Sequence, residues 1–524
     1  MRRRLASFEG ALPRAGAIRG LALGLLLGAT IVVGTSLRLA SQIAGPSRSP
    51  DAEAGEVRFA AEGPDSDRPP DPDRLVGAVK VTFDRQPIGM SFDLPWHFCQ
   101  VAENGLKFAH FAAETYDPRD WDGTGADASF EAGMDEQARF ARVWIEHQSP
   151  ARVVVRVRYA LVNAELQVAH DDLPTDSPYL DGKGDWGEER FTIYPDGVHV
   201  RHMKIHSGLA GSSRPFGFDR EPPAVIHEFM ETVVIGPAGH VPTDDLETDP
   251  ALTLIRMFGN EPGSVEPEGR EQGIAYEMPE GPPSDFGDFR DANILLVRSK
   301  SRYRPFVVAL PYGVAATPYG WEEDRRFPFA TWTGYGDPNI GYVAALGHLV
   351  NWWHYRRTET TIEQIYLHGM TDSADPRRAI MPIAWSWIVP PELQMPDDRL
   401  SPNGSAGRHD RPTYDPTQRA YLVPRANAGP EAIRFALDAI YDDEHLHGTM
   451  WLANPAIVVP EWNDDRTPID LELDGERLIE GKDFRRGYEK DASGTSLVLW
   501  IDRVIDLNDS DEHRIEIEIA PHRD

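Results

Sequence analysis

Short apolar segments with a two-residue period recur from Gly77 to the C-terminus, and they constrain the fold more than any other feature. In Ala151–Tyr159, for example, Arg156 and Arg158 alternate with valines. A strand points successive side chains to opposite faces, so this pattern is typical of a half-buried β-sheet. Prolines and glycines separate the segments, and helical periodicity is rare. We therefore expect an all-β fold of sandwich or barrel type.

One hairpin is especially clear, because Glu189–Ile193 and Val198–His206 flank a Tyr-Pro-Asp-Gly turn. Pro376–Trp387 and Gly429–Ala439 are the two candidates for a short helix, and Pro382 would interrupt the first. Further strand candidates are Ala224–Ile235, Asn293–Arg298, Pro305–Leu310, Thr360–Leu367, Ile457–Val459, Ile469–Leu473, Ser496–Ile501 and Ile515–Ile519.

A polar segment rich in turn-forming residues divides the strand-rich part of the chain at residues 397–417. We expect a large β-sandwich domain of the supersandwich kind at 77–396 and a small immunoglobulin-like β domain at 418–524. The segment 397–417 would then be a linker between them.

The N-terminal residues predict a location. A basic segment at 1–19 precedes an uncharged apolar run, Gly20–Leu37, whose length approaches the ~20 residues that span a bilayer. The flanking arginines would keep the N-terminus in the cytoplasm. Two interpretations remain open, an uncleaved transmembrane anchor and a cleaved signal peptide. In either case the rest of the chain is exported, as an inner-membrane protein facing the periplasm or as a secreted protein. Residues 38–76 are acidic and proline-rich, which predicts a disordered tether.

Composition excludes several classes of function. The chain has 84 acidic and 53 basic side chains and a formal net charge of −31, which argues against a nucleic acid as partner. Its single cysteine, Cys99, excludes an intrachain disulfide and a cysteine-rich zinc site. His227 and Glu228 begin a zinc-protease-like pattern that lacks the second histidine. No nucleophile elbow, phosphate loop or dinucleotide fingerprint occurs, and we expect no metal and no cofactor.

The second strand of the hairpin carries an unusual set of side chains. His202, Lys204 and His206 occupy even positions and would share one face, ~6.6 Å apart. Trp186 and Glu188 precede the turn on the first strand. This arrangement has two interpretations, an ordinary exposed polar face and the floor of a groove for an anionic ligand.

A second cluster lies at Gly347–Arg357, after an aromatic loop that contains Trp332. Aromatic rings beside polar groups suit the recognition of sugars, but tryptophan pairs also fill cores, and both interpretations stay open. The residues singled out in this cluster are His348, Asn351, Trp352, Trp353, His354, Tyr355 and Arg356.

Four segments resemble parts of bacterial carbohydrate-active proteins with two β-sandwich domains: Trp186–His202, His348–Glu359, Ala384–Leu393 and Asn454–Asp465. Polysaccharide lyases and related sandwich glycosidases are the nearest classes. The resemblance lies in the layout rather than in one motif. It implies a protein that acts on a polysaccharide or oligosaccharide, and His202, Lys204 and His206 make an anionic one the expected ligand. The N-terminal segment would bring the protein into contact with the bacterial membrane.

A lyase-like β-elimination on an acidic glycan needs a base, an acid and a group that neutralises the uronate. His202 or His348 is the candidate base, Tyr194 or Tyr355 the candidate acid, and Asn351, Arg201 or Arg356 the candidate neutralising group. The predicted substrate-binding residues are Arg201, Lys204, His206, Trp186, Glu188, Trp332, Trp352, Trp353, His354 and Arg356.

Two alternatives remain. A glycoside hydrolase would need two carboxylates ~5–9.5 Å apart. Glu188 and Glu189 are strand neighbours that point to opposite sides, so Glu359 or Glu363 would have to be the partner. The other alternative is a non-catalytic protein that binds glycan or serves a structural role in the envelope.

Overall fold

The computed structural model describes the chain between residues 58 and 522, with gaps. The predicted segments 1–19 and 20–37 and most of the predicted tether lie outside the described residues. No helix among the described residues is long and apolar enough to cross a bilayer. The longest gaps within the described part are 62–78, 117–128, 171–183, 209–225, 276–290, 318–329, 396–412 and 440–449.

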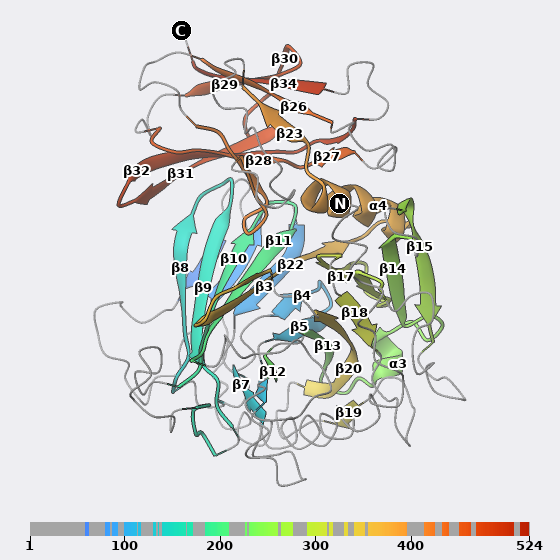
Figure 1. Ribbon diagram of the computed structural model, residues 1–524. Coiled ribbons are helices and arrows are strands. Elements are labelled where there is room, and N and C mark those ends of the chain that lie inside the picture. The colour runs from blue at the N-terminus through green and yellow to red at the C-terminus, as the bar shows by residue number, and fades with distance from the viewer. Residues whose placement is uncertain are drawn as a thin grey trace.

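The fold is nearly all-β, as the alternating pattern predicts. Within the described ranges, 34 strands form six sheets, accompanied by the helices α3 (Pro242–Asp245) and α4 (Pro376–Ile388). The two largest sheets lie below the C-terminal sheets in Figure 1. Their pairings are antiparallel throughout.

The nine-stranded sheet has the order β1-β2-β3-β4-β5-β13-β20-β18, and β19 also pairs with β20. Its strands are β1 (Arg58–Ala61), β2 (Val79–Phe83), β3 (Gln86–Phe92), β4 (Cys99–Val101), β5 (Lys107–Ala112), β13 (Met230–Pro237), β18 (Val314–Thr317), β19 (Ala330–Thr333) and β20 (Ile340–Asn351). Strand β1 lies within the predicted tether, so that prediction is wrong for these four residues, whose backbone pairs with β2.

The ten-stranded sheet has the order β15-β14-β16-β17-β22-β11-β10-β9-β8, and β21 also pairs with β22. Its strands are β8 (Arg142–Gln148), β9 (Val153–Ala160), β10 (Trp186–Ile193), β11 (His199–His206), β14 (Leu252–Phe258), β15 (Val265–Ile274), β16 (Ile294–Val297), β17 (Arg304–Ala309), β21 (Arg356–Arg357) and β22 (Thr361–Thr371).

The two large sheets pack face to face as a β-sandwich. At one end, Phe92 of β3 contacts Phe191 of β10 edge-on, with ring centroids 4.9 Å apart. Towards the other end, Phe108 of β5 and Leu254 of β14 belong to one continuous buried cluster. Interdigitated apolar side chains from two inner faces are what hold a sandwich together.

The predicted hairpin is β10–β11, and its turn has the expected chemistry. Gly197 has φ +76°, a left-handed conformation that suits glycine. Its N–H donates to the Tyr194 carbonyl at 2.9 Å, and the Asp196 carboxylate accepts from the Val198 N–H at 3.0 Å. The turn therefore fixes the register in which all eight residues of β10 face those of β11.

Helix α4 covers the outer face of the ten-stranded sheet at the end that carries the hairpin turn. Trp385 and Trp387 are fully buried in the same cluster as Val198 and Val200, which precede or begin β11. Pro382 lies inside the helix without ending it. The helix prediction is thus confirmed, but the predicted interruption is wrong, because this packing outweighs the ~3 kcal/mol that an internal proline costs.

The C-terminal strands form two five-stranded sheets and one two-stranded sheet, above the sandwich in Figure 1. The first contains β23 (Glu392–Gln394), β26 (Ile433–Asp438), β29 (Ile469–Leu473), β30 (Glu476–Arg477) and β34 (Arg514–Pro521). The second contains β24 (Tyr414–Asp415), β25 (Ala420–Leu422), β28 (Ala456–Val459), β31 (Phe484–Asp491) and β32 (Gly494–Ile501). The third pairs β27 (Trp451–Ala453) with β33 (Val504–Asp506). A three-stranded sheet elsewhere joins β6 (Glu114–Tyr116), β7 (Ser129–Glu131) and β12 (Ile226–His227).

Two expectations for this region differ from the structure. The described part of Gly429–Ala439 is not a helix, because Ile433, Phe435 and Leu437 alternate as buried residues of β26. The proposed linker also overlaps β24, and β23, on the large-domain side of the boundary, pairs with β26. Both short strands satisfy their backbone groups by joining the C-terminal sheets.

Candidate functional site

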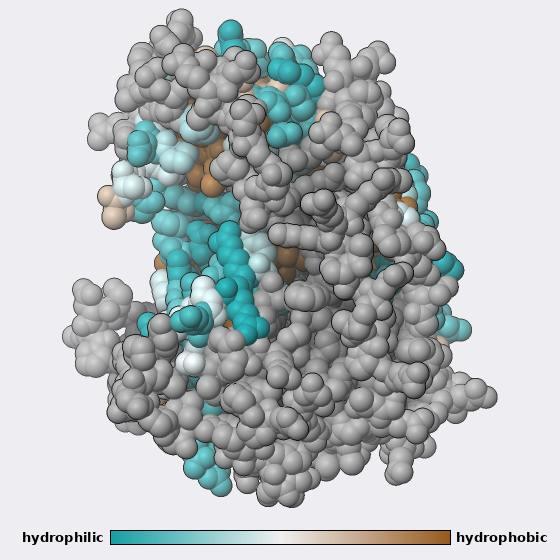
Figure 2. Space-filling view, viewed as in Figure 1, coloured by the Kyte–Doolittle hydropathy of each residue, from teal (hydrophilic) through white to brown (hydrophobic). Residues whose placement is uncertain are grey.

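The candidate site is the outer face of the ten-stranded sheet, on the side away from the nine-stranded sheet. Figure 2 shows hydrophilic side chains over β8 to β11, in a recess of the surface below the C-terminal sheets. We call these side chains the charged face, and all but Glu363 are exposed or half-buried. The charged face consists of Arg142, Trp144, Glu146, Arg156, Arg158, Trp186, Glu188, Arg190, His202, Lys204, His206, Arg356 and Glu363.

Strand register explains why these residues share a face. Residues directly opposite each other in antiparallel strands point to the same side. Glu188 faces Arg158 on β9 and Lys204 on β11, and Lys204 faces Glu363, which in turn faces Arg356. One row of charged residues therefore crosses the sheet.

Glu363 is the anionic centre of the charged face. Its Oε2 lies 3.0 Å from His202 Nε2, and its Oε1 lies 3.2 Å from Lys204 Nζ. The hydrogen bond from His202 and the charge of Lys204 hold the pKa of Glu363 at about 2, against the opposing effect of burial. Glu363 is therefore ionised near neutral pH and fixes the orientation of the His202 ring.

Trp186 is the middle layer of a stack. The His206 ring lies parallel to it at a centroid distance of 3.8 Å, and the Arg158 guanidinium lies 3.9 Å from the indole centroid. Two groups this close must occupy opposite faces of the indole, so Trp186 cannot offer a ring face to a sugar. It instead holds the Arg158 guanidinium in place by a cation–π contact.

The row of His202, Lys204 and His206 that the sequence predicts is only partly cationic. Burial and the charge of Lys204 lower the pKa of His206 to about 4, so this imidazole is neutral at neutral pH. The positive charge comes mainly from arginines on the neighbouring strands. The charged face has six arginine or lysine side chains against three glutamates, on a chain whose net charge is −31.

Glu146 links two of these arginines. It sits at a bulge in β8, so its carboxylate reaches sideways to Arg156 Nη2 and Arg190 Nε, each at 3.0 Å. Burial alone would raise the pKa of Glu146, but the Arg156 hydrogen bond and the charge of Arg190 lower it to about 2. Arg156 also pairs with Glu188. These contacts hold Arg156 and Arg190 beside His202, whose cross-strand partner on β10 is Arg190.

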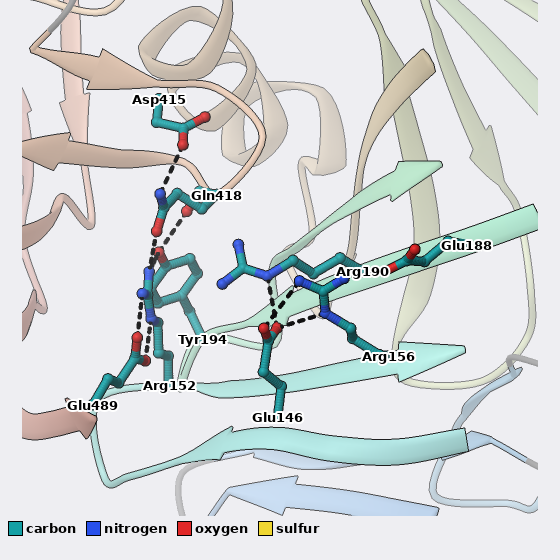
Figure 3. A network of polar contacts seen from close by, with 9 residues as sticks. All are labelled: Glu146, Arg152, Arg156, Glu188, Arg190, Tyr194, Asp415, Gln418 and Glu489. Atoms are coloured by element: carbon teal, nitrogen blue, oxygen red, sulfur yellow. Dashed lines mark hydrogen bonds and ion pairs between the residues drawn. The ribbon is translucent and has the colours of Figure 1, made fainter. Parts of the chain in front are cut away.

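Tyr194 does not lie on the charged face, and its predicted role as a catalytic acid beside His202 is wrong. It is fully buried where the C-terminal sheets meet the hairpin, and its hydroxyl donates to the Gln418 carbonyl at 2.5 Å (Figure 3). Arg152 donates to the Gln418 side chain at 2.8 Å, and the Gln418 amide donates to Asp415 at 2.7 Å. This interface is closed to substrate.

Arg201 is also misplaced by the sequence prediction, because it points into the sandwich. Its Nε and Nη2 donate to the two Glu189 oxygens at 2.6 and 2.8 Å, and Tyr159 donates to Glu189 at 2.6 Å. All three are buried. Gly187 makes room for this arrangement, since a Cβ there would lie 2.4 Å from the Tyr159 ring. Arg201 therefore neutralises Glu189 rather than a uronate.

The second predicted cluster divides between two sheets. His348 and Asn351 belong to β20 of the nine-stranded sheet, where the His348 backbone faces Glu231 and Thr317. Trp332 belongs to β19 of the same sheet. Trp352, Trp353 and His354 lie outside the described residues. Tyr355 and Arg356 lie beside β22 at the edge of the charged face, where the Tyr355 N–H donates to the Glu363 carbonyl at 2.9 Å.

Sequence reasoning missed six members of the charged face on β8, β9 and β10. Trp144, an exposed aromatic, faces Arg156 across β8 and β9. The alternation of Arg156 and Arg158 with valines was the available signal. It reveals the outward side of β9, but it does not say that β8 and β10 flank this strand. The missed residues besides Arg156 and Arg158 are Arg142, Trp144, Glu146 and Arg190.

The described side chains contain no group of three or more His, Cys, Asp or Glu that could hold a metal ion.

No protein-family model and no curated protein sequence matches this chain. Among solved structures, it is similar to a copper-containing benzylamine oxidase from Hansenula polymorpha, at 9% identity and a TM-score of 0.27 over 65% of each chain. A galactose 1-epimerase from Lactobacillus acidophilus NCFM aligns at 7% identity and a TM-score of 0.25, over 56% of this chain and 94% of the epimerase. A lysyl oxidase from Pichia pastoris aligns at 9% identity and a TM-score of 0.23, over 62% and 56%. Likenesses this weak carry no argument about function.

Proposed function

We propose that this chain is an exported carbohydrate-active protein that binds an acidic glycan on the charged face and cleaves it by β-elimination. The observation that carries the proposal is the His202–Glu363 pair, which sits beside Lys204 and Arg190 on an accessible face. Its domains would be a large supersandwich-like domain followed by an immunoglobulin-like one.

The charge of the face supports an anionic ligand. A cationic patch on a strongly acidic protein concentrates counter-ions there, while the rest of the surface repels them. Arg158 is exposed and stacks on Trp186, and no carboxylate among the described residues is ion-paired with it. Its guanidinium donors therefore remain available for a ligand carboxylate, which they match in geometry.

The position of His202 supports proton abstraction. With Nε2 turned to Glu363, Nδ1 is the nitrogen that would take the proton from the carbon next to the uronate carboxylate. The electron pair forms a double bond to the neighbouring carbon as the glycosidic C–O bond breaks. Lys204 and Arg190 would stabilise the negative charge that develops on the carboxylate. Tyr355, beside Glu363, would protonate the leaving oxygen.

The test uses the purified full-length protein and a panel of acidic polysaccharides, followed by ultraviolet absorbance. β-Elimination creates an unsaturated uronate that absorbs, and hydrolysis does not. We expect His202→Gln to lower kcat by about 100-fold or more with little change in KM. His240→Gln, at an exposed position after the strand β13 of the other sheet, should leave both unchanged. Normal turnover by His202→Gln would overturn the role of His202.

A glycoside hydrolase is the second candidate, and one observation favours it. Glu188 and Glu363 share the charged face and are separated by one strand, β11. Their backbones are therefore about 9.6 Å apart at the usual strand spacing. An inverting pair requires carboxyl groups ~6.5–9.5 Å apart, which side chains on one face at this spacing can reach. New reducing ends without a chromophore would support this candidate, and binding without either product would support a non-catalytic glycan-binding protein.

The proposal includes attachment to the bacterial membrane through Gly20–Leu37, on the periplasmic side, and it rests on the apolar run and its flanking arginines. Carbonate extraction of membranes from cells that make the full-length chain tests it. Retention in the membrane pellet supports an uncleaved anchor, and release as a shortened chain supports a cleaved signal peptide.

A further inference from the structure

The charges in one row of the charged face alternate in sign. From β9 to β21 the row reads Arg158, Glu188, Lys204, Glu363 and Arg356, each directly opposite the next. Cations therefore occupy every second strand and carboxylates the strands between them. The following inference rests on the proposed function, because it concerns the ligand of the same face.

The two outer cations are the ones available to a ligand. Arg158 stacks on Trp186, and Arg356 contacts the Tyr355 ring at 4.9 Å and its hydroxyl at 3.3 Å. Within the described part of the chain, neither is ion-paired to a carboxylate, and both are exposed. Lys204, midway between them, shares Glu363 with His202 and keeps about a third of its side chain exposed.

The spacing of the row matches a sugar repeat. Neighbouring strands lie ~4.8 Å apart, so cations on every second strand are about 9.6 Å apart. This is close to the length of a disaccharide unit in an extended glycan. The distance from Arg158 to Arg356 then corresponds to about four sugars. The glycan chain would run across the strands rather than along them.

The glutamates between the cations discriminate against other anions. A carboxylate placed directly over Glu188 or Glu363 would meet a like charge, which Arg156 offsets only from one side at Glu188. Glu363 is ionised because His202 and Lys204 hold its pKa at about 2. An uncharged sugar at the same place would instead donate hydroxyl hydrogen bonds to these oxygens. Specificity of this kind comes from repulsion as well as attraction.

We infer that the glycan bound by the charged face carries one carboxylate on every second sugar, with uncharged sugars between. Its uronates lie over Arg158, Lys204 and Arg356, and its uncharged sugars lie over Glu188 and Glu363. A glycan with a carboxylate on every sugar is a poorer ligand.

Calorimetric titration of the full-length protein tests this inference. The ligands are a hexasaccharide of alternating glucuronate and N-acetylglucosamine and a hexagalacturonate, which carries a carboxylate on every sugar. We expect the alternating ligand to bind about tenfold more tightly, the effect of one close like-charge contact. Glu188→Gln should remove most of that preference by improving hexagalacturonate binding. Glu271→Gln, on the far edge of the same sheet, should not change it.

The outcomes separate the two proposals. Equal affinities in the unsubstituted protein, or a preference that Glu188→Gln leaves intact, would overturn the alternating-ligand inference alone. If circular dichroism shows that the protein is folded but neither ligand binds, both the acidic-glycan function and the inference are overturned. Arg158→Met and Arg356→Met should each weaken the alternating ligand and lower the salt dependence of its binding.

Discussion

Arg152 and Glu489 form a bidentate ion pair although 337 positions separate them in the sequence. Nε donates to Oε1 at 2.6 Å and Nη2 donates to Oε2 at 2.7 Å, with both side chains at least nine-tenths buried. Burial opposes ionisation of Glu489, but the Arg152 contacts lower its pKa. Figure 3 shows that this pair and the Glu146 cluster lie near each other, so the C-terminal sheets are docked at one end of the charged face.

Breaking this pair from one side should destabilise the protein strongly. We expect Glu489→Gln to lower the free energy of unfolding by about 3–5 kcal/mol, because it leaves the Arg152 charge buried without its partner. Urea unfolding followed by tryptophan fluorescence measures the change. The double variant Arg152→Met with Glu489→Met should recover much of the loss, since no buried charge then remains.

The matched control is the exposed pair of Arg434 and Glu518, whose closest contact is 2.8 Å. Glu518→Gln should lower the free energy of unfolding far less than Glu489→Gln does, because water screens an exposed pair. Similar losses of unfolding free energy for Glu518→Gln and Glu489→Gln would show that burial of the Arg152–Glu489 pair does not increase its contribution to stability.

Removal of the C-terminal sheets should leave the sandwich insoluble. Trp387 and Val200 belong to a buried cluster that continues into Phe435 and Ile517 of the C-terminal strands. A chain that ends at residue 395 would expose this apolar surface, which favours aggregation. Size-exclusion chromatography and circular dichroism of that truncated chain are the measurements. A monomeric, folded product would mean that the two parts are independent.

The stability of the protein should fall as the pH drops below the ordinary range of histidine. Burial, with a smaller effect of Arg201, lowers the pKa of His199 from 6.5 to about 3. The unfolded chain binds a proton near pH 6.5 and the folded chain does not, so this contribution is complete above pH 6.5 and is lost progressively towards pH 3. At pH 5 the loss amounts to about 2 kcal/mol.

His199→Phe should flatten this dependence, because phenylalanine keeps the ring that stacks on His368 and has no proton to bind. Urea midpoints measured from pH 7.5 to 4.5 give the slopes. An unchanged slope in His199→Phe would assign the acid sensitivity to other groups.

The sequence predicts local structure well where one strand carries its own signal. The alternation along β11 predicts that His202 and Lys204 share a face, and the Pro-Asp-Gly turn predicts the hairpin. Gly429–Ala439 was misassigned as a helix, because a short apolar run has no clear period until its neighbours in the sheet are known.

Contacts between distant segments could not be predicted in this way. The alternation along β11 also places Arg201 opposite to His202, but only the pairing of β9, β10 and β11 brings Glu189 and Tyr159 to it. Likewise, His348 lies in the other sheet from His202, which follows from strand order and not from the composition of either segment. The charged face is a product of non-local pairing.

The stack of Arg158, Trp186 and His206 should support ligand binding by positioning the arginine. Trp186→Ala removes the surface that holds the guanidinium, and we expect acidic-glycan affinity to fall about tenfold, the effect of losing ~1.4 kcal/mol. Trp186→Phe should restore part of the affinity, since a smaller ring still supports the cation.

Because the pKa of His206 is about 4, the imidazole stays neutral above pH 5. Titration of His206 should therefore not change the affinity between pH 5.5 and 8. Calorimetric titration of the three proteins across that range is the measurement. A rise in affinity on acidification that His206→Gln abolishes would mean that His206 is a charged contact with the ligand and not a neutral layer of the stack.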